Sequence, residues 1–171
     1  MQRLKQMKGS DSLKMGDLSY TELSSWTTVA IVITMLCYYI NKLATLDAAG
    51  MLNSVNHNRL ILLVVAITIV TEIIFQIIVA VSKRYEAEAP LDERDEMFHA
   101  KATKISSGFL FGFIGILILI VAQSDMLIEL LSLNLRGLSP KDVLLSVLVI
   151  GFGMAQLTHH LILGIYYRRG S

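Results

Sequence analysis

The stretch Leu60–Val81 decides the fold, and it reads L-I-L-L-V-V-A-I-T-I-V-T-E-I-I-F-Q-I-I-V-A-V. A helix needs about 20 mostly apolar residues to cross about 30 Å of hydrocarbon, and this stretch meets that length. Three further apolar blocks lie on either side of it, at Trp26–Ile40, Ile105–Ala122 and Val143–Tyr167. Because the chain is 54% hydrophobic, the pattern predicts one all-α integral membrane four-helix bundle.

The polar residues between these blocks divide the chain into two predicted regions. We expect a cytoplasmic N-terminal arm over 1–18 and a transmembrane domain over 19–171. The four spans are predicted near 22–41, 60–82, 104–123 and 141–167.

Helix starts are marked by capping residues. Ser19–Glu22 has the capping-box pattern, and Ser139 precedes a proline at the first helical position. Asp92 is the expected N-cap of a third helix that begins before the bilayer and continues into it.

The segment Leu43–Val55 mixes apolar and acidic residues, and we expect it to form a short amphipathic piece outside the spans, broken at Gly50.

Lys and Arg are unevenly divided between the segments outside the spans. Eleven of the fifteen fall in the N-terminal arm, the segment between the second and third spans, and the C-terminal tail: Arg3, Lys5, Lys8, Lys14, Lys83, Arg84, Arg94, Lys101, Lys104, Arg168 and Arg169. The positive-inside rule makes these segments cytoplasmic, so both termini are predicted inside. The net charge of +1 and the lack of a basic stripe indicate no nucleic-acid partner.

Glu72 is the polar residue that most needs an explanation, because a carboxylate at bilayer centre costs about 2.5–3.5 kcal/mol. Gln76 lies one turn further along the same span. The fourth span runs in the same direction and brings Gln156, His159 and His160 to a similar depth. We interpret these five residues as an ion or proton site, in which Glu72 and a histidine share protonation. The alternative is a neutral carboxyl that hydrogen-bonds a neighbouring helix, with the histidines used in packing.

Metal, cofactor and catalytic sites are not predicted. The four predicted spans contain no His-x-x-x-His or Glu-x-x-His spacing, and Cys37 is the single cysteine of the chain. No nucleophile and base stand in a recognisable pattern. We therefore expect a non-enzymatic protein that uses no cofactor.

The start of the third helix is unusually acidic for a segment beside a cytoplasmic membrane surface. We interpret it as a docking surface for a protein partner, formed by Asp92, Glu93, Arg94, Asp95, Glu96 and Lys101. A well-capped helix whose charges suit the helix dipole is the alternative explanation.

The run Asp92-Glu-Arg-Asp-Glu96, followed by Lys101-Ala102 and a span, resembles a group of small bacterial and archaeal membrane proteins of unknown function. Members carry a similar acidic motif before a late helical hairpin. The motif covers a short part of the chain, and the four-span layout covers the rest. The resemblance implies a multi-pass protein of the prokaryotic plasma (inner) membrane, and it implies no particular activity.

Small residues form a stripe on the third span, at Gly108, Gly112 and Gly115, and glycines recur on the fourth span. Such stripes let helix backbones approach closely, either within one chain or between copies. We expect a homo-oligomer that functions as a small transporter or channel. The alternative is a membrane sensor, immunity or accessory protein that binds a cytoplasmic or membrane partner through residues 90–104.

Overall fold

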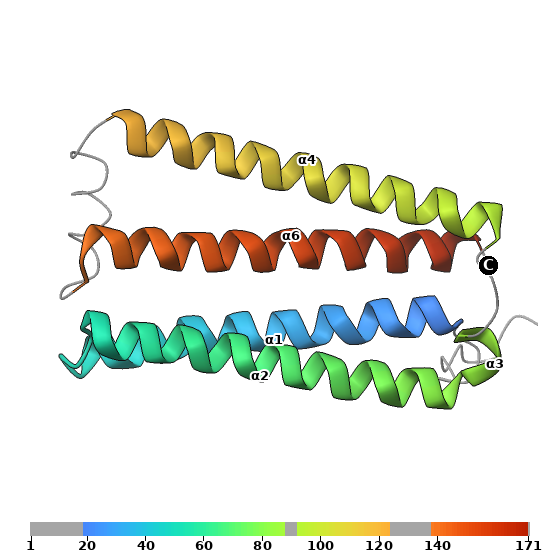
Figure 1. Ribbon diagram of the computed structural model, residues 1–171, viewed down its shortest axis with the longest axis horizontal. Coiled ribbons are helices and arrows are strands. Elements are labelled where there is room, and N and C mark those ends of the chain that lie inside the picture. Colours follow the sequence, from blue (N-terminus) through green and yellow to red (C-terminus); the bar gives the residue numbers. More distant parts are fainter. Residues whose placement is uncertain (1–18, 88–91, 124–137, 171) are drawn as a thin grey trace, which may run out of the picture.

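The computed structural model describes residues 19–87, 92–123 and 138–170, and the predicted arm over 1–18 lies outside these ranges. Within them helices are the one kind of regular secondary structure (Figure 1). The helices are α1 Tyr20–Ala48, α2 Ser54–Ser82, α3 Arg84–Ala87, α4 Glu93–Gln123 and α6 Pro140–Gly170. The four long helices are each long and apolar enough to cross a membrane, as expected for a multi-pass membrane protein.

The predicted helix starts are confirmed. The side chain of Ser19 accepts from the backbone N–H of Glu22 at 3.2 Å, and that of Asp92 accepts from Asp95 at 2.7 Å. Asp92 caps α4, which runs unbroken to Gln123. These side chains satisfy N–H groups that have no partner within the helix.

The prediction of a separate amphipathic piece over Leu43–Val55 is wrong. Helix α1 continues to Ala48 and α2 begins at Ser54, so the connection is short. Leu43 and Leu46 pack against buried residues of neighbouring segments, and this packing keeps the last turns of α1 helical. The break does fall at Gly50, whose φ of 65° favours glycine.

The helices form an open arrangement in which α6 is central. Helix α1 packs on both α2 and α6, while α4 packs along α6 and makes little contact with α1 or α2. Figure 1 shows the start of α1 and the end of α6 at one end of the molecule, which we call the terminal end. The α1–α2 connection and the start of α6 lie at the opposite end, called the connection end.

Little apolar surface is buried inside a single chain. In the most apolar segment of α2 only 11% is buried, against 22% in the corresponding segments of α1 and α6. Clusters of buried side chains join the helices near both ends, with Tyr39 and Leu60 at the connection end and Phe98 and Leu163 at the terminal end. The outward-facing Ile, Leu and Val side chains are suited to contact with lipid.

The two glycine stripes differ in what they contact. A Cβ added at Gly151 would lie 2.0 Å from the Phe113 ring, and one at Gly164 would lie 3.0 Å from Trp26. Glycine at these positions therefore permits α4 and α1 to approach α6 closely. A Cβ at Gly108, Gly112 or Gly115 would meet nothing within 4 Å, so this predicted seam makes no close packing contact inside the described chain.

Candidate functional site

A cavity of about 200 Å³ lies between α1, α2 and α6. Its walls are mostly aliphatic. Helices α2 and α6 contribute polar side chains to the walls, and α1 contributes the ring of Tyr39. The lining residues are Val32, Met35, Leu36 and Tyr39 of α1, Val64, Val65, Thr68, Ile69 and Glu72 of α2, and Val149, Phe152, Gly153 and Gln156 of α6. Two of the five predicted site residues, Glu72 and Gln156, therefore line one cavity.

The Glu72 carboxyl is an unsatisfied polar group of this cavity. Glu72 is half-buried, and no residue within the described ranges gives it a hydrogen bond or an ion pair. Thr68 lies one turn away, but its hydroxyl donates to the carbonyl of Val64 at 2.7 Å. Glu72 is thus available to a proton, a water molecule or a cation that enters the cavity.

Gln76 is used differently from its neighbour Glu72. Its Oε1 accepts from the hydroxyl of Ser24 at 2.8 Å, and its Nε2 donates to the hydroxyl oxygen of Thr28 at 3.1 Å. Thr28 is only 1% exposed, so the amide joins α2 to the interior face of α1. The prediction placed Gln76 at the ion site, and the structure places it one turn from Glu72 in a contact between helices.

The two histidines of α6 lie away from the cavity. The Nδ1 atom of His159 lies 3.4 Å from the hydroxyl of Ser106 on α4, and His99 of α4 is close enough to interact electrostatically with both histidine rings. The rings of His159 and His160 are 5.0 Å apart and nearly perpendicular. Neither histidine lines the cavity beside Glu72, so the predicted Glu–His pair is not brought together.

The depth predicted for these histidines is nevertheless consistent with the way that α2 and α6 are aligned along their lengths. Side-chain contacts between α2 and α6 join residues 88 or 89 positions apart, at Ser54 with Asp142 and at His57 with Ser146. Extending that register along the two parallel helices places Glu72 roughly level with His160. The prediction failed in direction around the helix for His159, because its ring faces Ser106 of α4.

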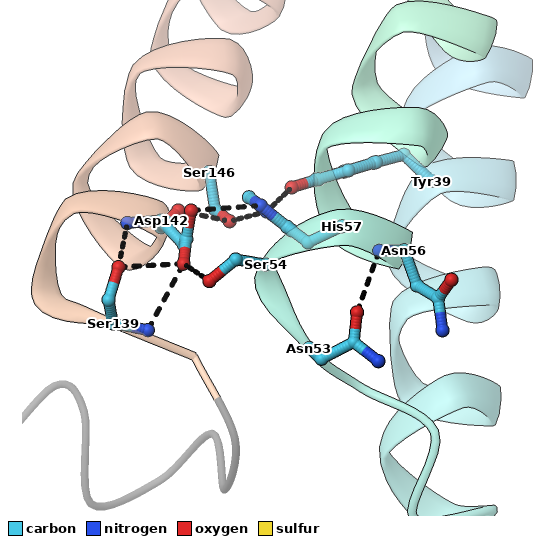
Figure 2. A network of polar contacts seen from close by, with 8 residues as sticks. All are labelled: Tyr39, Asn53, Ser54, Asn56, His57, Ser139, Asp142 and Ser146. Atoms are coloured by element: carbon cyan, nitrogen blue, oxygen red, sulfur yellow. Dashed lines mark hydrogen bonds and ion pairs between the residues drawn. The ribbon is translucent and has the colours of Figure 1, made fainter.

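A second polar cluster at the connection end was not predicted from the sequence. Figure 2 shows the ring of His57 enclosed by side chains from α1 and α6. The connection-end cluster comprises Tyr39, Ser54, His57, Ser139, Asp142 and Ser146. His57 and Tyr39 are completely buried, and Asp142 and Ser146 are each 4% exposed.

His57 is the centre of this cluster. Its Nε2 lies 2.7 Å from the hydroxyl of Ser146 and 3.3 Å from that of Tyr39. Its Nδ1 faces the Asp142 carboxylate at 3.9 Å and makes no hydrogen bond to a described residue. One side chain of α2 therefore contacts both α1 and α6.

Asp142 completes a capping box and also joins two helices. Its Oδ2 accepts from the backbone N–H of Ser139 at 3.1 Å and from its hydroxyl at 2.7 Å, while its own N–H donates to Ser139 Oγ at 3.3 Å. The same Oδ2 accepts from the hydroxyl of Ser54 on α2. The cap was visible in the sequence, but its link to α2 spans 88 positions and was not.

Ser146, His57 and Asp142 follow the order of nucleophile, base and acid in a catalytic triad, an arrangement that the sequence did not reveal. However, the hydroxyl of Ser146 donates to the carbonyl of Asp142 at 3.1 Å, and the residue is nearly inaccessible. A nucleophilic serine must instead present its oxygen to a substrate. We therefore interpret the cluster as a tether between three helices.

The acidic start of α4 is anchored on one side. Phe98 is buried and stacks on Tyr166 with ring centroids 5.4 Å apart, and Lys101 lies over the Tyr166 ring. Asp95 is half-buried beside Tyr167 of α6. The remaining residues of the predicted docking surface are exposed: Asp92, Glu93, Arg94 and Glu96.

Among the described residues, no group of three or more His, Cys, Asp or Glu side chains is arranged to hold a metal ion. The sequence matches no protein-family model, no curated protein and no solved structure. The resemblance carried by Asp92–Glu96 therefore stays a prediction, and the functional argument depends on the site itself.

Proposed function

We propose that this protein moves protons or cations across the bilayer and that Glu72 is the carboxylate that binds and releases them. The observation that carries the proposal is the Glu72 side chain, which lines a cavity without a hydrogen-bond partner in the described chain. We propose no enzymatic activity.

The energetic argument is that a carboxylate deep in a membrane domain needs compensation. Its cost at bilayer centre is about 2.5–3.5 kcal/mol, and no protein group in the described ranges offsets it. Gln76 does not offset this cost, because its amide oxygen bonds Ser24 and its amide nitrogen bonds Thr28. A proton or a cation would neutralise the charge, and the cavity gives it room to arrive and leave.

Polar groups on both sides of the cavity support a path along α1, α2 and α6. Towards the connection end, Tyr39 both lines the cavity and contacts His57. Towards the terminal end, Gln76, Ser24 and Thr28 continue the polar face. Chains of such groups are typical of proton relays in membrane proteins.

We further propose that the terminal end is cytoplasmic, in a prokaryotic plasma membrane. The distribution of Lys and Arg supports this orientation, and the resemblance supports the location. We also propose that the protein is a homo-oligomer, since the Gly108–Gly115 stripe makes no close contact within the described chain and Gly-rich stripes pack helices together in membranes.

The test is pH-gradient-driven flux in proteoliposomes that contain the full-length protein. Wild type should show flux above empty liposomes, Glu72→Gln should abolish it, and Glu72→Asp should retain part of it. Asp47→Asn is the matched control, because it removes a carboxyl from the last turns of α1, away from the cavity. Equal flux through folded wild type and Glu72→Gln would contradict the proposal.

A second candidate function is partner binding through the start of α4. It is favoured by the exposure of Asp92, Glu93 and Glu96 on a helix whose opposite side is held by Phe98. Charge reversal at Glu93 and Glu96 should then remove binding of a basic partner while leaving flux unchanged. Asp95 is unsuitable for this test, because it contacts α6 through Tyr167.

A further inference from the structure

The size of the cavity limits what it accepts. An engineered cavity of about 150 Å³ in another protein is large enough to bind benzene. The cavity beside Glu72 has about 200 Å³ and so offers room for an aromatic ring with a small additional group.

The walls combine one unsatisfied acid with apolar surface. Met35, Leu36 and Val149 provide aliphatic contact, and the rings of Tyr39 and Phe152 provide aromatic contact. Glu72 is the acidic residue among the lining residues, and no described residue pairs with it. Apolar walls select an apolar body, aromatic rings attract a cation, and an unpaired carboxylate requires a positive charge nearby.

A small inorganic cation does not fit these walls well. Ions such as Ca²⁺ take six to eight oxygen ligands, and Mg²⁺ demands a near-octahedral set. The oxygen-bearing lining residues are Glu72, Gln156, Thr68 and Tyr39, and the Thr68 hydroxyl is already bonded to Val64. An organic ammonium, whose charge is surrounded by carbon, needs no such shell of oxygens.

We propose that this cavity binds a small organic ammonium ion that carries an apolar, aromatic-sized substituent, with Glu72 as its counter-ion. The inference rests on the proposed function, because it names the class of cation that Glu72 binds. Where Glu72 is protonated beforehand, binding of the ammonium releases one proton, so the two cations compete for one carboxylate.

The route of entry is from the lipid. Val65, Ile69 and Phe152 line the cavity and are also 42%, 52% and 59% exposed on the outer surface of the bundle. These side chains of α2 and α6 therefore separate the cavity from the bilayer and contact both. A cation with an apolar substituent concentrates at the membrane interface and can reach such a wall, whereas a fully hydrated ion cannot.

The test uses radiolabelled benzyltrimethylammonium and full-length protein in lipid nanodiscs. We expect saturable binding to wild type, weakened at least about tenfold by Glu72→Gln, because the ion pair in a low-dielectric cavity is lost. Asp47→Asn is the matched control: it removes a carboxyl from the last turns of α1, away from the cavity, and should change affinity by less than about twofold.

Neopentylbenzene is the neutral isostere of this probe and separates charge from shape. We expect it to compete at least about tenfold less well than unlabelled benzyltrimethylammonium. Equal competition would overturn the proposal in favour of an apolar cavity that holds lipid chains. Absence of saturable binding to folded wild type would overturn it as well.

Flux and binding together distinguish the two proposals. Proton flux that depends on Glu72 without binding of the ammonium would overturn the ligand assignment and leave the proposed function standing. Binding that depends on Glu72 without flux across the bilayer would support the ligand assignment and overturn the transport function.

Discussion

The connection-end cluster and the Glu72 cavity are built from the same three helices but use their polar groups in opposite ways. In the cluster, Asp142 accepts several hydrogen bonds and His57 contacts two other helices. Both side chains have almost no exposure. In the cavity, Glu72 is half-buried and no described residue bonds to its carboxyl. Tyr39 belongs to both regions.

The difference teaches how a polar residue in a membrane helix can be assigned a role. A group whose donors and acceptors are satisfied by neighbouring helices contributes to packing, and its loss leaves partners unsatisfied. A group that lines a cavity without partners gains nothing from the fold and is free to bind something else. On this comparison, stability should depend on the cluster and transport on the cavity.

The largest expected effect on stability comes from Asp142→Ala. The substitution removes the capping box of α6 and leaves Ser54 and His57 without their acidic neighbour, which should cost about 2–3 kcal/mol. Thermal or denaturant unfolding in detergent measures the loss. Lys141→Ala, at the exposed adjacent position, is the control. Equal unfolding of the two variants would show that the cluster is not a tether.

A smaller effect is expected from Tyr39→Phe, which removes the hydroxyl shared by the two regions. The 3.3 Å contact with His57 should be worth about 0.6 kcal/mol, the average for hydrogen bonds between membrane helices. Flux should also slow, because Tyr39 joins the cluster to the cavity. Tyr38→Phe is the control at an exposed ring. Unchanged flux would confine the path to the cavity and the terminal end.

The smallest effect on stability is expected from Glu72→Gln. Because no described residue bonds to Glu72 and a bound proton or cation neutralises its charge, unfolding free energy should change by less than about 0.5 kcal/mol even though flux is lost. The same unfolding assay as for Asp142→Ala measures it. A loss above about 1 kcal/mol would mean that Glu72 has a structural partner, and the contrast between the regions would fail.

Several features could be read from residue order alone, because they depend on interactions within one helix. Four apolar stretches of sufficient length predict the four long helices, and local capping at Ser19, Asp92 and Ser139 marks where three of them begin. Glu72 was identifiable because an acid is costly in any membrane span, whatever surrounds it. The register of α2 and α6 also follows from helix length and direction.

Tertiary structure decided which polar groups meet. Each residue turns the helix by about 100°, so Gln156 and His159, three positions apart, point about 60° apart. They therefore contact different partners although they lie at nearly one depth. The bond between His57 and Ser146 spans 89 positions, and the sequence gives no local sign of it. The open space beside Gly112 and the close contact at Gly151 likewise depend on where α1 and α4 pack. A glycine allows close approach of a helix at either position, and only the packing decides which position is used.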